Sequence, residues 1–213
     1  SNMALPLENT FSSNASIAAA ASGRFENIRL AETDTRLEAR AAAWATARRA
    51  ALARNGTGSL SRFCSTCWYF AEGLTAHFVR LGRTPPTLGL VCIGLPGTFI
   101  EAFMPEKTLV RAGCTHTFPG VREAQIYNVM IRPLTRLPLK GWLWQQGEHN
   151  LQTNAVSGNS LTRTGYGCEL PALVRAWRAA WSAAPNSTSP LAPFGISTLE
   201  ARAGWFGALD FGG

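Results

Sequence analysis

Short apolar stretches of strand length recur along the chain between longer segments of helical character. The clearest are residues 87–93, which follow Pro85-Pro86, and residues 140–144. Residues 27–30 and 194–199 are weaker candidates of the same kind. Near-continuous apolar character without alternation is typical of a parallel strand covered on both faces. We therefore expect these stretches to form a mostly parallel sheet.

Segments with helical composition lie between these strands. Residues 64–82 carry apolar side chains at helical spacing, and residues 35–54 are rich in alanine and arginine up to the helix terminator Asn55-Gly56. Further expectations are a short alanine-rich helix late in residues 1–23, a turn and helix start at 94–104, irregular chain at 105–124, and helices at 125–134 and 166–183. Helices that alternate with strands predict a three-layer α/β/α sandwich.

The composition is that of one globular domain. The chain has 213 residues, of which 46% are hydrophobic and 15% charged, so it can bury one substantial core but is short for two. A Pro/Ser-rich loop is expected at residues 185–193 and a poorly defined tail at residues 200–213. No apolar run approaches the roughly 18 residues of a membrane span, so no such span is expected.

The net charge of +7 comes almost entirely from arginine. Arginines scatter along the chain except for a group at positions 36, 40, 48, 49 and 54. A nucleic-acid-binding surface requires basic side chains clustered with aromatic ones on one face. We interpret the group as a solvated helix face and expect no nucleic-acid partner.

Five cysteines are present, at positions 64, 67, 92, 114 and 168. Cys64 and Cys67 form a lone C-x-x-C, and no second pair or histidines are suitably spaced to complete a zinc site, so no metal is expected. The odd number fits one or two disulfides with one thiol left over.

A polar cluster follows the apolar stretch that ends at Trp144. The chain changes there abruptly to Gln145-Gln146-Gly147-Glu148-His149-Asn150. In open α/β sheets, ligands bind just beyond the carboxyl ends of the strands, and a glycine there lets the backbone approach a substrate closely. The cluster is therefore placed where a functional site is expected.

Five blocks of sequence, taken in order, resemble motifs of one enzyme family. Residues 146–150 are similar to a strand-ending Gln-Gly-Glu-Ser-Asn motif. Ser1-Asn2-Met3 is similar to the tail of Gly-Gln-Ser-Asn-Met, and residues 67–70 are similar to Cys-Trp-Tyr-Phe-Gly. Residues 97–103 are similar to Gly-Thr-Pro-Ile-Glu-Ala-Trp, and residues 168–178 to Phe-Pro-Ala-Leu-Ile-x-x-Trp-Arg. The chain thus resembles the sialate O-acetylesterases of the SGNH-type hydrolases. The resemblance implies the flavodoxin-like form of the sandwich, here incomplete at both ends.

The resemblance implies that Ser1 is the nucleophile of a serine esterase. Its hydroxyl would attack the acetyl carbonyl and form an acetyl-enzyme that water then hydrolyses. A second interpretation takes Ser1 and Asn2 as a cloning remnant ahead of a starting Met3. A third, an N-terminal-nucleophile hydrolase with its own α-amino group as base, has no supporting motif.

The remaining candidates would bind the substrate or the oxyanion. The resemblance implies that Gln146 and Asn150 are donors, that Glu148 orients the network, and that the Gly97 backbone contributes. Pro96 stands where the family has a glycine and has no N–H to donate, so a donor that this glycine supplies in relatives is lost here, whereas one supplied by the second glycine survives at Gly97. The alternative for Pro96-Gly97 is that it forms a simple turn. The alternative for Gln146, Glu148 and Asn150 is that they make ordinary hydrogen bonds within a loop.

Glu101 matches a glutamate of the family, although a carboxylate interacting with a helix dipole explains it equally well. No catalytic histidine or aspartate is identified, because none of His77, His116 and His149 follows an aspartate by three residues as the family's Asp-x-x-His requires. No residues precede Ser1 to form the family's first strand. These absences predict that the sequence is a piece of a longer esterase.

Two functions follow from this sequence. The first is a serine carboxylesterase, without a cofactor, that removes O-acetyl groups from sialic acids or other acetylated glycans. The alternative is an inactive homologue or carbohydrate-binding module that keeps the pocket but lacks the catalytic histidine. The resemblance implies a secreted or lysosomal setting, and acceptor sequons at Asn14, Asn55 and Asn186 agree with it.

Overall fold

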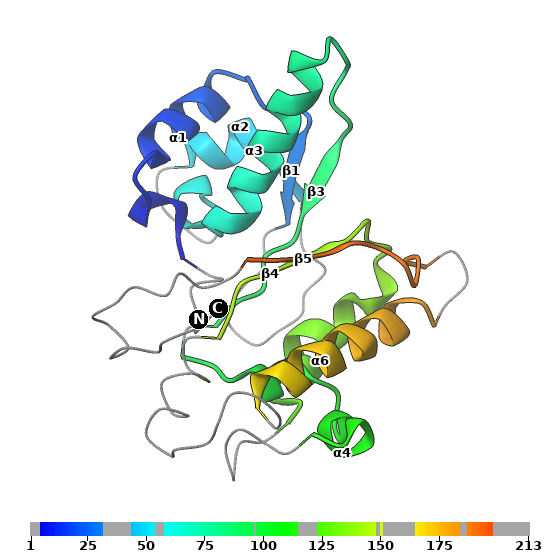
Figure 1. The fold of residues 1–213 in the computed structure, drawn as a ribbon. Coiled ribbons are helices and arrows are strands. Elements are labelled where there is room, and N and C mark those ends of the chain that lie inside the picture. Colours follow the sequence, from blue (N-terminus) through cyan, green and yellow to red (C-terminus); the bar gives the residue numbers. More distant parts are fainter. Residues whose placement is uncertain are drawn as a thin grey trace, which may run out of the picture. The chain divides into compact units, whose positions relative to one another are not determined.

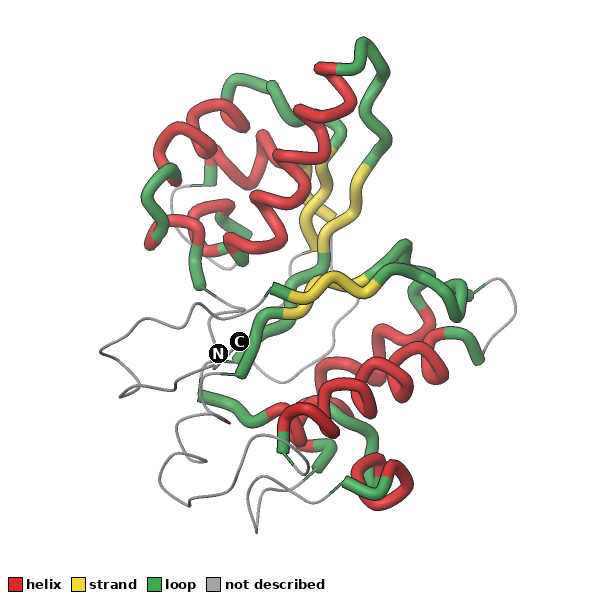
Figure 2. The backbone as a smooth tube through the Cα atoms, in the orientation of Figure 1, coloured by secondary structure: helices red, strands yellow, loops and turns green. Residues whose placement is uncertain are grey.

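The structure is a computed structural model of the chain. It describes residues 5–31, 44–53, 58–95, 97–114, 123–147, 150, 165–183 and 187–197. Contacts between Cα atoms divide the chain into two compact units with a boundary between Pro96 and Gly97. We call residues 5–95 the N-terminal unit and residues 97–197 the C-terminal unit (Figures 1 and 2).

The N-terminal unit contains a three-stranded sheet. Its strands are β1 (Ile28–Ala31), β2 (Trp44–Thr46) and β3 (Leu88–Leu90), in the order β2-β1-β3. The central strand β1 pairs in parallel with β3, with Ile28 opposite Leu88, and antiparallel with β2. The parallel pairing of the 87–93 region is therefore as expected, although the strand itself is shorter.

Three helices pack on one side of this sheet: α1 (Ser13–Ala21), α2 (Ala47–Leu52) and α3 (Ser65–Arg80) (Figure 1). Short 3-10 turns η2 (Leu7–Asn9) and η3 (Leu60–Arg62) complete the unit. Apolar side chains from the helices, the turns and the sheet form one cluster: Leu7, Ala20, Phe25, Ile28, Leu30, Ala45, Ala47, Ala50, Leu60, Trp68 and Ala71. Alternation along β1 and β2 places Ile28, Leu30 and Ala45 in this core.

The opposite side of the sheet is more open than the sequence predicts. Gly89 and Trp44 are both exposed, so β3 is not covered on both of its faces. The Trp44 indole reaches over Gly89, where a Cβ atom would lie 3.1 Å from the ring. The missing side chain at Gly89 therefore makes room for the tryptophan.

The C-terminal unit is built around a parallel strand pair covered by a long helix. Strands β4 (Trp142–Trp144) and β5 (Phe194–Ile196) pair in register, and α6 (Tyr166–Trp181) lies between them in sequence. Ring-to-ring contacts at 5.6 to 6.0 Å join the helix to the strands: Trp142 with Trp181, Trp144 with Trp177, and Trp177 with Phe194. Such edge-to-face and tilted pairs add to the stabilisation from burial alone.

Shorter elements precede β4. They are the 3-10 turn η4 (Ile100–Phe103), helix α4 (Thr108–Ala112), the π-helical turn η5 (Tyr127–Ile131) and the 3-10 turn η6 (Arg132–Arg136). Helix α4 lies in the region expected to be irregular, and it is confined between Lys107 and Gly113, both in the left-handed conformation. The turn η6 begins at Arg132 and holds Pro133 as its second residue, so the helical region continues past the end expected at residue 134.

The expected helix over residues 35–54 is wrong in its middle. Trp44–Thr46 form strand β2, and helix begins only at Ala47, where the Thr46 hydroxyl caps it by accepting from the Arg49 backbone N–H at 3.1 Å. Alanine and arginine favour helix locally, but pairing with β1 determines the conformation of this segment. Residues 32–43 lie outside the described residues.

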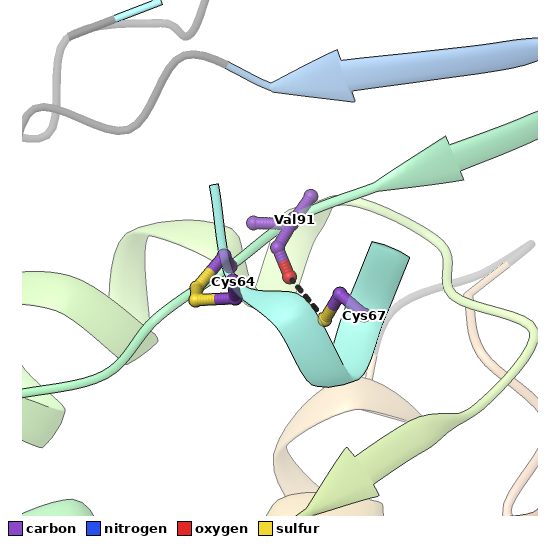
Figure 3. Close-up of a disulfide and its surroundings, with 4 residues drawn as sticks. Cys64, Cys67 and Val91 are labelled. Carbon is purple, nitrogen blue, oxygen red and sulfur yellow. Dashed lines mark hydrogen bonds between the residues drawn. A yellow bond between two sulfur atoms is a disulfide. The ribbon is translucent and has the colours of Figure 1, made fainter. Parts of the chain in front are cut away.

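Each unit holds one disulfide. Cys64 is bonded to Cys92, with 6.0 Å between their Cα atoms, and Cys114 to Cys168, with 5.7 Å. Cys67 is the leftover thiol and lies beside the first bridge, 4.0 Å from the Val91 carbonyl oxygen (Figure 3). Burial raises the pKa of the Cys67 thiol to about 11. Because Cys64 is in a disulfide, the C-x-x-C does not present two free thiols.

Candidate functional site

Gln146 lies two residues beyond the last residue of β4 and is almost completely buried. Its Nε2 donates to the Thr98 carbonyl oxygen at 3.1 Å and to Asn150 Oδ1 at 2.7 Å. The strand end thus delivers this side chain to the turn at residues 98–101. The structure brings Gln146 and Asn150 together, and the roles expected for them in a reaction stay predictions.

Asn150 is the centre of the polar cluster and has no solvent exposure. Its Oδ1 accepts the Ile100 backbone N–H at 3.1 Å as well as the Gln146 amide. Its Nδ2 donates to Glu101 Oε2 at 3.1 Å. Both ends of the Asn150 amide are therefore fixed by groups from η4 and from the β4 end.

Glu101 is also fully buried, within the 3-10 turn η4. Its position in the first turn of η4 agrees with the helix-dipole explanation, and its carboxylate also accepts a hydrogen bond from Asn150. Sequence reasoning left Glu101 out of the site. Its position one residue after Ile100, which binds the same asparagine, could not be inferred without the fold. We name residues Glu101, Gln146 and Asn150 the buried polar triad.

A second set of hydrogen bonds holds the backbone at Gln146. The Tyr166 hydroxyl donates to the Gln146 carbonyl oxygen at 2.7 Å and accepts from Trp144 Nε1 at 2.8 Å. Tyr166 begins α6, so this helix fixes the chain where it leaves β4. The sequence offered no signal for this role, because the partners are 20 and 22 residues apart.

Two oxygens of the buried polar triad lack partners. Glu101 Oε1 and Gln146 Oε1 are both inaccessible to solvent and have no hydrogen-bond partner among the described residues. A buried polar atom left unpaired costs about 1–3 kcal/mol. Natural structures contain few such atoms, and they are concentrated where a ligand, water or catalytic role explains them.

Gly97 precedes this cluster at the turn. It is exposed, its φ of 71° is left-handed, and nothing lies within 4 Å of where a Cβ would be. A left-handed turn is thus present, and its use as an oxyanion donor stays a prediction. Ser1, Pro96, Glu148, His149 and His116 lie outside the described residues.

His77 lies elsewhere, on the exposed side of α3 in the N-terminal unit. Its Nδ1 is 3.1 Å from an Arg80 guanidinium nitrogen. This surface contact, one helical turn apart, is structural.

No three His, Cys, Asp or Glu side chains are grouped as a metal site would require anywhere in the described ranges. The helices in that part of the chain also lack the length and apolar character needed to cross a lipid bilayer. The site is thus built from amides, one carboxylate and backbone groups. Such groups bind by hydrogen bonding: amide N–H groups stabilise an oxygen that gains negative charge, and the free oxygens accept from hydroxyl or N–H groups.

Comparison with known proteins finds related sequences. The chain is 28% identical over 156 residues to the sialate O-acetylesterases of Homo sapiens and Pongo abelii, and 26% identical over 183 residues to that of Mus musculus. Each match covers 68% of this chain, but only 27% of the first two proteins and 31% of the third. The chain therefore spans about a quarter to a third of the length of these relatives. No family model matches it.

Proposed function

We propose that this chain, a relative of the sialate O-acetylesterases, forms part of an esterase that hydrolyses O-acetyl esters of sialic acids or related sugars. The observation that carries the proposal is the buried polar triad. It joins two of the five sequence blocks, residues 97–103 and 146–150, through direct hydrogen bonds. Blocks 48 to 50 residues apart thus meet in one place, as the parts of a site do.

In this proposal the reaction is a two-step acyl transfer. The Ser1 hydroxyl oxygen bonds to the acetyl carbonyl carbon while a base takes its proton; the sugar oxygen then departs with a proton and leaves acetyl-Ser1. Water attacks this ester in the same way, releasing acetate and restoring the hydroxyl. Negative charge develops on the carbonyl oxygen in both steps, and preorganised N–H donors stabilise it.

The described residues support specific roles in this scheme. Asn150 is the proposed N–H donor to the oxyanion, and Nδ2 is its only donor atom, because its Oδ1 accepts from Ile100 and Gln146. Glu101 is a positioning residue that fixes the Asn150 amide by accepting from Nδ2. Gly97 supplies a backbone N–H at the turn, and Glu148, which lies outside the described residues, keeps the orienting role that the resemblance implies.

The proposal also covers the fold of the protein and the compartment in which it works. The parallel pairs β1–β3 and β4–β5 would belong to a mostly parallel sheet in a three-layer sandwich of a single domain. The two disulfides support an oxidising compartment, secretory or lysosomal, because such bonds persist there.

Acetate release from an O-acetylated sialic acid tests the function. The chain, its Ser1→Ala variant and the control Ser12→Ala would be assayed together, Ser12 being an exposed serine without a side-chain cap bond. We expect any release by the chain to persist in Ser12→Ala and to be lost in Ser1→Ala, because only Ser1 is proposed as the nucleophile. Folded protein that releases no acetate but still binds the sugar would favour a carbohydrate-binding module instead.

A further inference from the structure

The orientation of both amides in the buried polar triad is determined by backbone atoms. The Ile100 N–H can only donate, so the Asn150 atom it contacts at 3.1 Å must be Oδ1. The Thr98 carbonyl oxygen can only accept, so the Gln146 atom 3.1 Å away must be Nε2. The 2.7 Å contact between the two side chains then runs from Gln146 to Asn150.

This arrangement uses all of the donors of Gln146. A primary amide has two N–H hydrogens, and Gln146 donates them to Thr98 and Asn150. Only Oε1 remains, and it is buried without a partner among the described residues. Gln146 therefore cannot stabilise an oxyanion without giving up one of these bonds, which revises the donor role expected from the sequence.

We propose that Gln146 Oε1 is an acceptor for a hydroxyl group of the ligand, and that it selects acetylated sugars with a free hydroxyl near the ester. The proposal rests on the proposed function for the identity of the ligand. The two amides of the site then have opposite tasks. Asn150 donates toward the acetyl group, and Gln146 accepts from the sugar.

A buried acceptor suits this selection. A site with an unpaired buried polar group discriminates strongly in favour of a ligand that supplies the missing partner, because a ligand lacking it leaves the group unpaired. Oε1 is covered in the free protein, so the hydroxyl reaches it through a local shift of the covering residues. Tyr166 and Trp144 keep the Gln146 backbone in place during such a shift.

Nuclear magnetic resonance on the full chain tests the donor assignment directly. We expect both Nε2 protons of Gln146 to exchange slowly with solvent, in contrast to those of the exposed Gln125. Adding O-acetylated sialic acid to the Ser1→Ala variant should shift the Gln146 Cδ carbonyl resonance while its Nε2 protons stay protected. Fast exchange of these protons, or an unchanged Cδ resonance at saturation, would overturn the proposal.

Calorimetric titration with two esters tests the selection. One is an O-acetylated sialic acid with its neighbouring hydroxyl free, and the other is the same ester with that hydroxyl methylated. We expect the methylated ester to bind at least about tenfold more weakly, a difference of about 1.4 kcal/mol. The ratio should fall toward one in Gln146→Met, which removes the acceptor and keeps the side-chain length, but not in the control Gln125→Met.

Equal affinity for the two esters, or no binding of either, would overturn the proposal. These outcomes differ from failure of the esterase function, which is judged by acetate release from the unsubstituted chain. A protein that releases acetate without preferring the free hydroxyl would keep the function and lose the selection. A protein that prefers the free hydroxyl without releasing acetate would keep the selection and lose the esterase function.

Discussion

The two units bury different kinds of side chain. The N-terminal core is mainly alanine and aliphatic residues, and its buried polar groups are hydroxyls of serine and threonine. The C-terminal unit packs tryptophan and phenylalanine rings together and buries a glutamine, an asparagine and two glutamates. Buried amides and carboxylates cost more to desolvate than buried hydroxyls. Their concentration in the C-terminal unit makes that unit the candidate for the functional site.

The aromatic packing and the buried polar triad are adjacent in the C-terminal unit. Trp144 contacts both Phe103 and Trp177, and Phe103 ends the same turn that holds Glu101. Rigid surroundings of this kind keep catalytic side chains in position, which matters because small displacements cost rate. The N-terminal unit, with smaller side chains, has no described counterpart to the triad.

Removal of the disulfides is expected to have the largest effect on stability in either unit. Cross-linking restricts the unfolded chain more when the closed loop is longer, and the sequence separations are 54 for Cys114–Cys168 and 28 for Cys64–Cys92. We expect removal of the first pair by double alanine substitution to lower the free energy of unfolding by about 4 kcal/mol, and removal of the second by about half a kcal/mol less. Urea denaturation measures both, and a larger loss from the shorter loop would contradict this account.

Substitution of an asparagine in each unit should separate function from stability. Asn150→Ala removes the proposed oxyanion donor, and we expect kcat for acetate release to fall by about 10²–10³. Asn27→Ala removes hydrogen bonds to the Thr75 hydroxyl and the Pro86 carbonyl, both 3.0 Å long, and should cost about 1 kcal/mol of stability with kcat unchanged. Equal kcat for both variants would remove Asn150 from the reaction.

Substitution of alanine for two glycines is expected to change the free energy of unfolding in opposite directions. A Cβ on Gly141 would lie 2.7 Å from the Pro193 carbonyl oxygen, which accepts the Trp142 N–H, so Gly141→Ala should destabilise by about 1–3 kcal/mol. Gly73 is an exposed position inside α3 with nothing within 4 Å of its Cβ site, so Gly73→Ala should stabilise by about 0.5–1 kcal/mol. Thermal unfolding of the two variants gives both signs.

Cys67 should produce the smallest effect. Its pKa is raised from 9.0 to about 11, so the thiol is almost wholly protonated at neutral pH. We expect slow alkylation by iodoacetamide, with a rate that rises about tenfold per pH unit up to pH 11. The native state holds this proton more tightly than the unfolded state, so the thiol contributes stability that is complete below pH 9 and is lost as pH rises toward 11. A Cys67→Ala variant should lack that loss.

Much of the fold could be predicted where the sequence pattern is local. The apolar stretches before Trp144 and around Phe194 form strands, and residues 65–80 and 166–181 form helices, because periodicity reports burial of one segment at a time. Strand β2 could not be predicted, because its pairing with Ala31 and Arg29 outweighs the helical preference of its surroundings. Which cysteines pair also depends on the fold.

The same contrast between local sequence patterns and contacts that depend on the fold applies to the candidate site. Gln146 and Asn150 were expected in a site because a polar cluster follows an apolar stretch and because residues 146–150 resemble a family motif. Their opposite hydrogen-bonding roles depend on Thr98 and Ile100, whose backbone groups carry no signature in the sequence. Glu101 was noticed as a match, but only the fold places it against Asn150.

The hydrogen bonds of the buried polar triad also have a kinetic consequence. Those that reach Thr98, Ile100 and Glu101 join chain positions 48 to 50 residues apart, so these three cannot form until a long loop has closed. Contacts of this separation are made late on the folding pathway, after local helices such as α6. We therefore expect destabilising substitutions in the triad to accelerate unfolding and to leave the refolding rate nearly unchanged. The persistence of the site in the native protein would then be governed by how slowly it opens rather than by how fast it assembles.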